Sequence, residues 1–149
     1  MGDTPVWVVD TNVLVSGLLS PFGPPGRIVD ALQARRLRLA LDDRIEAEYR
    51  DVMARPRLGV ARFRREAFLA TLQFQQHVTA APWTYRRPPD EDDTMFLEVA
   101  FQTAALTVVT GSLRHFPPGC RGPVTVRSPR DAWDFIVRLQ YDDEARRGG

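Results

Sequence analysis

Short apolar runs rich in valine recur along the chain, and longer stretches with helical spacing separate them. A short apolar run bounded by polar residues is typical of a strand that is buried on both faces. The longer stretches repeat their apolar residues at the spacing of amphipathic helices. Strands that alternate with helices predict βαβ units and a parallel sheet covered on both sides. We therefore expect an α/β fold of three layers, α/β/α, around a central, mainly parallel twisted sheet of about four or five strands.

The predicted elements follow one another through nearly the whole chain. Strands are expected at residues 6–9, 37–41, 107–110 and 124–126. Helices are expected at residues 28–32, 45–53, 63–74, 90–105 and 129–139. A chain of 149 residues has the usual length of one domain. We predict a single domain over residues 1–140 and a charged tail, residues 141–149, that frays.

Composition excludes several classes of protein. Hydrophobic residues make up 44% of the chain and charged residues 26%, as in soluble globular domains. No apolar stretch is long enough to span a membrane, and the first residues lack the basic start and long apolar segment of a signal peptide. Cys120 is the only cysteine, which excludes an internal disulfide, and with only His115 nearby it is best interpreted as an incidental loop thiol. We expect a cytoplasmic protein without membrane association.

Asp10 directly follows the first predicted strand. In open parallel sheets, ligands bind beyond the carboxyl ends of the strands, so Asp10 is expected at a binding edge. An aspartate in this position can also cap the helix that follows it. The position of Asp10 by itself favours neither role.

A second acidic feature, residues 90–93, begins the fourth predicted helix. Acidic residues at a helix start interact favourably with the helix dipole, and this alone can explain the cluster. Asp93 is different because it lies on the apolar face of that helix, whereas Asp92 points about 100° away. The other members of this face are Phe96, Leu97, Ala100, Phe101 and Ala104. A carboxylate that faces the core needs a cation or several hydrogen bonds, and a metal ion is one such partner.

Two further oxygen donors are candidates for the same site. Glu46 and Glu48 flank the apolar stripe of the second predicted helix on opposite edges, and periodicity does not choose between them. Either one alone is also explained as a solvated glutamate. Ser112 follows strand 107–110 and reaches the edge that carries Asp10 if the strands are parallel. Carboxylates and a hydroxyl, without clustered histidines or thiols, suit Mg²⁺ or Mn²⁺, which activate water and stabilise charge on a phosphate.

In their order along the chain, these motifs resemble those of the PIN-domain family, in the VapC-like ribonuclease branch of toxin–antitoxin toxin components. The resemblance runs from Val6 to about Leu139. Its motifs are V-V-D-T-N-V-L-V-S at 8–16, I-E-A-E-Y-R-D-V at 45–52 followed by R-P-R-L at 55–58, D-D-T-M-F-L-E-V-A at 92–100 and V-V-T-G at 108–111. The D-T-N on the first strand is fairly specific, and the other motifs gain weight from their order.

Carried over by position, the resemblance implies that Asp10, Glu48 and Asp93 are the metal carboxylates, which selects Glu48 over Glu46. The family commonly has a fourth acid directly after T-G, and here Ser112 takes that place. A serine can hydrogen-bond a water molecule but brings no charge. We therefore expect Ser112 to leave a second metal ion weakly held and to reduce the strength of catalysis.

The resemblance also implies supporting roles for four residues. Thr11 and Asn12 are expected to orient Asp10 or the attacking water, and Thr110 to support the metal edge. His115 is expected either to contact phosphate or to act as an acid. A solvated loop histidine is the simpler interpretation of His115.

The activity that the resemblance implies is Mg²⁺- or Mn²⁺-dependent endoribonuclease cleavage of single-stranded or structured RNA. The implied partners are an antitoxin protein and a second copy of the chain in a homodimer. The formal net charge of +1 does not by itself indicate nucleic-acid binding, so RNA needs a local basic patch. Arg86 and Arg87, beside the acidic segment, are the best candidates, ahead of the arginines within 35–38 and 62–65. A solvated surface is the simpler interpretation of each cluster taken alone.

Two other functions remain open from the sequence. With Ser112 in place of an acid, the chain can be a PIN-like module that has lost its chemistry and acts as a binding partner. A more distant hypothesis is a phosphohydrolase of another α/β family that uses Asp10 as a nucleophile. The absence of an aspartate two residues after Asp10 argues against that hypothesis.

Overall fold

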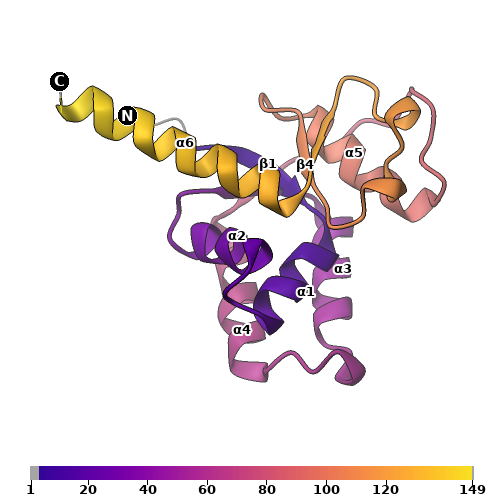
Figure 1. The fold of residues 1–149 in the computed structure, drawn as a ribbon. Coiled ribbons are helices and arrows are strands. Elements are labelled where there is room, and N and C mark those ends of the chain that lie inside the picture. Colours follow the sequence, from indigo (N-terminus) through magenta and orange to yellow (C-terminus); the bar gives the residue numbers. More distant parts are fainter. Residues whose placement is uncertain (1–3, 149) are drawn as a thin grey trace.

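Figure 1 shows the computed structural model of the chain, in which residues 4–148 are described. Within this part of the chain, five strands form one sheet in the order β3-β2-β1-β4-β5, and each neighbouring pair is parallel. The strands are β1 (Val6–Val9), β2 (Arg38–Leu41), β3 (Gln76–His77), β4 (Thr107–Val109) and β5 (Thr125–Arg127). The expected parallel sheet is confirmed.

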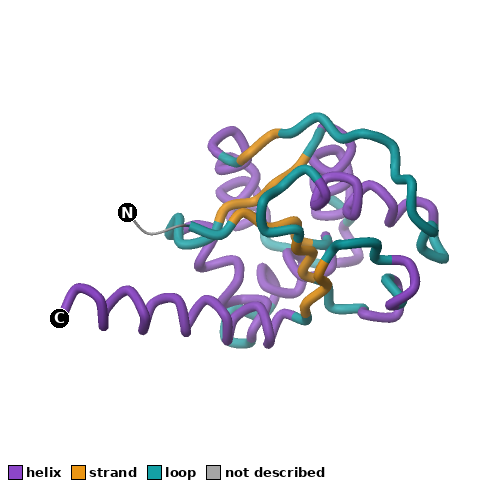
Figure 2. Tube along the Cα trace, turned by 90° about the horizontal axis from the view of Figure 1, so that it is seen from above, coloured by secondary structure: helices purple, strands orange, loops and turns teal. Residues whose placement is uncertain are grey.

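Helices cover this sheet. They are α1 (Thr11–Leu19), α2 (Pro24–Gln33), α3 (Asp43–Met53), α4 (Arg62–Ala70), α5 (Thr94–Phe101) and α6 (Pro129–Gly148). α5 packs on β1, β2 and β4, while α2 packs against α1 and α6. The view from above shows helices on both sides of the strands (Figure 2). The expected three-layer α/β/α fold is therefore confirmed.

The core lies on both faces of the central strands. Residues 7–9 of β1 and 39–41 of β2 are all buried. Parallel strands need such continuous apolar runs because helices cover both of their faces. The carboxyl ends of the strands are left as an edge where polar side chains can gather.

α1 and α2 approach each other closely because two glycines lack a Cβ. A Cβ on Gly17 would lie 2.5 Å from the carbonyl oxygen of Pro25, and one on Gly26 would lie 2.3 Å from that of Pro21. Both neighbours are backbone atoms with little freedom to move. The proline-rich loop is thus a tight connection between two helices, and α2 begins inside it at Pro24, earlier than predicted.

Other elements also differ from the prediction, and α1 was not among the predicted helices. The two-residue strand β3 was not predicted because its polar side chains carry no strand pattern. The expected helix 63–74 divides into α4 and a 3₁₀ turn, Thr71–Phe74. The expected helix 90–105 divides into the 3₁₀ turn Glu91–Asp93 and α5. Because α5 ends at Phe101, its apolar face ends at Ala100, and Phe101 and Ala104 are exposed.

The last helix is longer than predicted. α6 continues to Gly148, so residues 141–148, which we expect to fray, are helical in the structure. This part of α6 is largely exposed and projects beyond the rest of the fold (Figure 2). No helix within residues 4–148 is both long enough and apolar enough to cross a membrane.

Candidate active site

Parallel pairing of β1 and β4 places Asp10 and Thr110 side by side at the carboxyl edge of the sheet. The backbone N–H of Asp10 donates to the carbonyl oxygen of Val109 at 2.8 Å. The hydroxyl of Thr110 donates to Oδ2 of Asp10 at 2.9 Å. Both side chains are buried. The strand ends therefore hold the Asp10 carboxylate in one position.

Asp10 precedes α1, but its carboxylate makes no capping hydrogen bond to that helix. Burial is the largest influence on this group, and it raises the pKa of Asp10. The Thr110 hydroxyl, the N–H groups of Asn12 and Thr11 and the nearby His115 oppose the rise in pKa. Thr110 is the largest of these opposing influences, the N–H groups at the start of α1 add to it, and the buried charge of Asp10 is only partly compensated.

Glu48 on α3 faces the same edge. The hydroxyl of Thr11 donates to Oε2 of Glu48. Burial raises the pKa of Glu48, and the negative charges of Asp10 and Asp92 raise it further. Glu46 instead pairs with Arg50 on the outside of α3, at 3.1 Å. The structure thus distinguishes the two glutamates. The Thr11 hydroxyl bonds Glu48, while the Thr11 N–H interacts with Asp10.

Asp93 completes a group of three carboxylates. It ends the 3₁₀ turn before α5, and its side chain is only 15% exposed, whereas Asp92 is exposed. Burial and then the negative charge of Asp10 raise the pKa of Asp93 to about 6, and His115 lowers it. Nδ1 of His115 lies 3.9 Å from Oδ2 of Asp93. The inward orientation predicted for Asp93 is confirmed.

The loop after β4 brings the remaining predicted residues to this edge. The N–H of Ser112 donates to Oγ1 of Thr110 at 3.1 Å, which places the half-buried Ser112 next to the partner of Asp10. The N–H of Gly111 donates to Oδ1 of Asn12 at 3.2 Å. The side chain of Asn12 therefore ties this loop to α1, while its N–H interacts with Asp10. His115 is 44% exposed at the rim.

The donor chemistry suits a hard divalent cation, but the side chains are not gathered around one point. Among residues 4–148, no three Asp, Glu, His or Cys side chains lie close enough to hold a metal ion as they stand. Like charges repel, and two of the carboxylates, Glu48 and Asp10, are each bonded by a threonine hydroxyl. A cation would offset both burial and repulsion, and all-oxygen ligands are those that Mg²⁺ prefers. Joint coordination by Asp10, Glu48 and Asp93 requires rotation of their side chains.

Tyr49 supports the site and was not predicted to do so. Its ring is fully buried, and its hydroxyl donates to the carbonyl oxygen of Val9, directly before Asp10. In the sequence, Tyr49 belongs to an apolar stripe and is indistinguishable from an ordinary core residue. The hydrogen bond to Val9 fixes the backbone from which Asp10 extends.

Tyr49→Phe is expected to lower the free energy of unfolding by about 1–3 kcal/mol, because a buried carbonyl oxygen loses its donor. Urea denaturation followed by circular dichroism measures this change. Tyr141→Phe is the matched control, since Tyr141 is 69% exposed on α6, and it should change stability by less than about 0.5 kcal/mol. Equal effects of the two substitutions would contradict the structural role of the Tyr49 hydroxyl.

A buried acid on α5 was also not singled out from the sequence. Oε2 of Glu98 accepts from the N–H of Trp83 at 2.8 Å, and its Oε1 accepts from Arg44 at 2.8 Å. The signal that could have revealed it is a charged residue within the otherwise apolar run 95–100. Glu98 anchors the loop before α5 to the body of the fold.

A hollow of about 460 Å³ opens beside Glu48. Its lining residues are Arg44, Glu48, Arg87, Glu91, Asp92, Thr94, Met95 and Glu98. The hydroxyl of Thr94 is buried there and has no hydrogen-bond partner within the described part of the chain. The structure thus brings Arg87 next to Glu48, while Arg86 lies outside the hollow.

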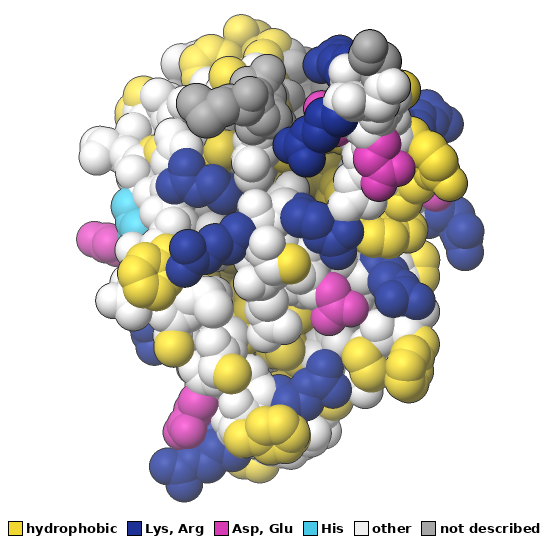
Figure 3. Space-filling model, turned by 90° about the vertical axis from the view of Figure 1, so that its left-hand side faces the viewer, with side chains coloured by type: hydrophobic (Ala, Val, Ile, Leu, Met, Phe, Trp, Pro, Cys, Tyr) yellow, Lys and Arg dark blue, Asp and Glu magenta, His cyan; other side chains and the backbone are white. Residues whose placement is uncertain are grey.

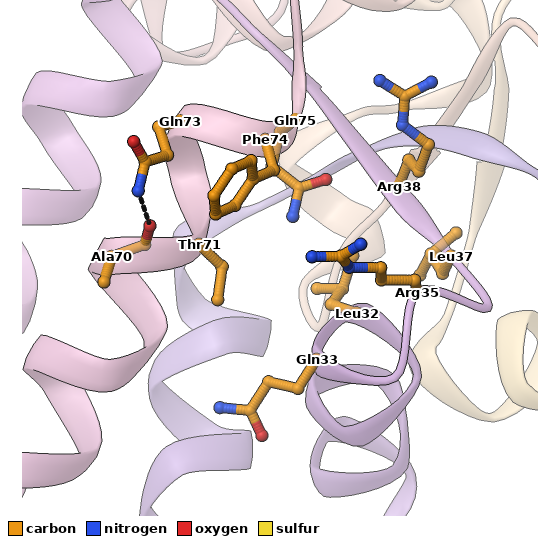
Figure 4. A pocket seen from close by; sticks show the side chains of 10 residues that line it. All are labelled: Leu32, Gln33, Arg35, Leu37, Arg38, Ala70, Thr71, Gln73, Phe74 and Gln75. Carbon is orange, nitrogen blue, oxygen red and sulfur yellow. Dashed lines mark hydrogen bonds between the residues drawn. The ribbon is translucent and has the colours of Figure 1, made fainter.

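The other arginine clusters lie away from this edge. A hollow of about 530 Å³ at the amino ends of β2 and β3 includes Arg35 and Arg38 but none of the predicted site residues (Figure 4). The Arg35 guanidinium stacks over Phe74 there, 5.6 Å from the ring centroid. Arg62 pairs with Glu66. Arginines are scattered over the face at the end of α6 rather than gathered into a stripe (Figure 3).

One comparison with known proteins identifies the family of the chain. A family model described as PIN domain matches residues 6–114, most of the chain, and the match includes Asp10, Glu48, Asp93 and Ser112. Neither the curated proteins nor the solved structures contain a significant match. PIN domains as a class are nucleases that typically depend on divalent metal ions. With its parallel five-stranded sheet and this match, the chain belongs to the PIN-domain family.

Proposed function

We propose that the chain is a Mg²⁺- or Mn²⁺-dependent endoribonuclease and the toxin of a toxin–antitoxin pair. The observation that carries the proposal is the position of Asp10, Glu48 and Asp93 at the same edge of the sheet, where burial raises the pKa of each. Carboxylates with perturbed pKa values beside an open hollow are typical of catalytic sites. Membership of a nuclease family supports the same conclusion.

In this proposal Asp10, Glu48 and Asp93 hold the metal ion. When bound, a divalent ion supplies an activated water molecule and offsets the charge that develops on the phosphate. Thr110 and Thr11 orient Asp10 and Glu48 through their hydroxyls. The hydrogen bond from the Tyr49 hydroxyl to the carbonyl oxygen of Val9 fixes the backbone next to Asp10.

His115 and Ser112 occupy the other side of the site. His115 is exposed beside Asp93, which supports a role for its imidazole in contacting a phosphate or donating a proton to the leaving oxygen. Ser112 lies next to Thr110 and contributes a neutral hydroxyl where the family commonly has an acid. We infer that Ser112 allows a water molecule to be oriented but leaves a second metal ion loosely held.

The central test is cleavage of single-stranded RNA by the purified chain. Wild-type protein should cleave in Mg²⁺ or Mn²⁺ and stop when EDTA is added, and Asp10→Asn should reduce the rate by about a hundredfold or more, because one ligand charge is lost. Asp30→Asn is the control, since Asp30 is exposed on α2 and changes the net charge equally. Failure to cleave with either metal, or equal rates for wild type and Asp10→Asn, would refute the proposal.

Ser112 favours a second candidate, a PIN-like module without catalysis that acts as a binding partner. The substitution Ser112→Asp distinguishes the two candidates. In the nuclease, the added carboxylate should increase cleavage at low metal concentration, whereas Ser112→Ala, which removes the hydroxyl without adding a charge, should not. Mn²⁺ binding by the wild type without turnover, unchanged by Ser112→Asp, would favour the binding module.

The antitoxin, the homodimer and a cytoplasmic location belong to the same proposal and rest on the family resemblance. Phe22 and Phe63 are exposed large apolar side chains, which support a subunit contact. The mass of the protein in solution tests the homodimer. Growth arrest on expression in a bacterium, relieved by Asp10→Asn, tests the toxin role.

A further inference from the structure

Two exposed aromatic rings lie together at the end of α5. Tyr85 is 46% exposed and Phe101 is 44% exposed. Their ring centroids are 6.1 Å apart, and Trp83 contacts both rings, at 5.1 Å from Tyr85 and 6.2 Å from Phe101. A grouped set of exposed aromatic rings commonly marks an interaction surface.

The surroundings hold Tyr85 in position. Trp83 is buried, its N–H donates to Glu98, and its indole Nε1 donates to the carbonyl oxygen of Arg86 at 3.0 Å. On the other side lies Gly122, whose φ is 51° and whose added Cβ would stand 2.8 Å from the Tyr85 ring. The loop after β4 thus packs against Tyr85 through Gly122. The aromatic surface is therefore formed before any partner binds.

Cations connect this surface to the carboxylates. Arg86 and Arg87 follow Tyr85 directly, are exposed, and form no ion pair within residues 4–148. Arg87 lines the hollow that also contains Glu48 and the unpartnered Thr94 hydroxyl. The other cation of the hollow, Arg44, is paired with Asp42 and Glu98. Arg87 in the hollow and its neighbour Arg86 therefore carry the attraction for an anion. Aromatic rings beside free arginines provide both stacking and phosphate contacts.

The distances along α5 suit a short stretch of an extended polymer. Asp93 and Phe101 lie at opposite ends of α5, about 12 Å apart at a rise of 1.5 Å per residue. Arg87 is near the Thr94 end, and Tyr85 is near the Phe101 end. The basic and aromatic groups thus extend in one direction from the carboxylate edge.

We propose that single-stranded RNA lies along the outer side of α5, with a base stacked on Tyr85 and Phe101 and its phosphates at Arg86 and Arg87, so that the strand continues to the carboxylate edge. The cleavage of the bound strand, as distinct from its binding, rests on the proposed ribonuclease function. Bases inside a duplex are already stacked and cannot contact the rings, so the surface discriminates in favour of single strands.

The test is binding of a fluorescent single-stranded RNA of mixed sequence, measured by anisotropy in Mg²⁺. The full chain carrying Asp10→Asn is used so that the RNA is not cut. Adding Tyr85→Leu, which keeps apolar contact with Trp83 but removes the aromatic face, should weaken binding about tenfold or more, and Tyr85→Phe should restore it. Arg86→Gln and Arg87→Gln should each weaken binding. Each should also reduce the slope of log affinity against log salt concentration by about one, the equivalent of one phosphate contact.

The matched control is Tyr141→Leu, which removes an exposed ring from α6. Equal RNA affinities for Tyr85→Leu and Tyr141→Leu would overturn the inference. So would a Tyr85→Leu variant that changes only the mass of the protein in solution, because the surface would then be a protein contact. Duplex RNA that binds as tightly as single-stranded RNA would also overturn it.

The two proposals fail in different ways. Tyr85-dependent RNA binding by a wild-type chain that never cleaves would leave the RNA surface in place and refute the ribonuclease. Cleavage by the wild type, with the same KM for Tyr85→Leu, would keep the ribonuclease and refute the RNA surface.

Discussion

Asp93→Asn is expected to remove RNA cleavage and to stabilise the metal-free protein at the same time. At pH 7.5 Asp93 is ionised, although burial and the charge of Asp10 raise its pKa to about 6. Asparagine has the same shape without the charge, so the repulsion disappears. The melting temperature of the metal-free protein should rise by about 2–4 °C, the equivalent of roughly 1 kcal/mol for a domain of this size.

The same substitution should lower the cleavage rate by about a thousandfold. Stabilisation of charge by a divalent ion amounts to several kcal/mol, and each loss of about 1.4 kcal/mol slows a reaction tenfold. Differential scanning fluorimetry in EDTA and RNA cleavage in Mn²⁺ measure the two effects. Asp30→Asn, which removes an exposed charge from α2, should change neither. A variant that is both less stable and fully active would show that Asp93 is an ordinary structural residue.

The stability gained by Asp93→Asn depends on pH with a defined sign. A raised pKa means that the folded protein favours the protonated carboxyl, so the wild type loses stability as pH rises from about 4 through about 6. Asparagine does not titrate. The advantage of the variant should therefore be present at pH 7.5, decline as pH falls below about 6 and disappear near pH 4.

Mg²⁺ or Mn²⁺ should raise the melting temperature of the wild type by about 5–10 °C at pH 7.5. A ligand at a hundred times its dissociation constant stabilises a protein by about 2.7 kcal/mol, and each kcal/mol shifts the melting temperature of a domain of this size by about 2–4 °C. Metal ions bind the deprotonated carboxylates, and Asp93, Asp10 and Glu48 all have raised pKa values. The thermal shift should therefore become small near pH 5.

Two controls separate this effect from general salt stabilisation. NaCl at equal ionic strength should leave the melting temperature nearly unchanged. Glu48→Gln should lose most of the metal-induced shift while it keeps the fold. A shift of the same size at pH 5 and pH 7.5, or in Glu48→Gln, would place the metal elsewhere on the protein.

These predictions rest on carboxylates that the sequence identifies to different degrees. Asp10 comes directly after the buried run Val6–Val9. Because the carboxyl ends of parallel strands all lie at the same edge of the sheet, the position of Asp10 could be inferred. The inward orientation of Asp93 follows from helical periodicity. Both inferences use only local spacing along the chain.

Glu48 could be chosen only by family resemblance or by tertiary structure. Glu46 and Glu48 are equivalent in periodicity, and the rotation of α3 about its axis decides between them. Packing of Tyr49 against the carbonyl oxygen of Val9 sets this rotation and turns Glu48 towards the hydroxyl of Thr11. These contacts join residues far apart in sequence, so no local pattern contains them.

The sequence by itself determined the parallel α/β fold and the end of the sheet at which Asp10 lies, because apolar periodicity reports burial one element at a time. Tertiary structure alone decided the short strand β3, the end of α5 at Phe101 and the anchoring of Trp83 by Glu98. It also decided the raised pKa values, because desolvation and repulsion depend on distances between groups brought together by folding. The sequence identifies a carboxylate as a candidate for the site, and its neighbours in the folded protein determine its charge and its possible ligands.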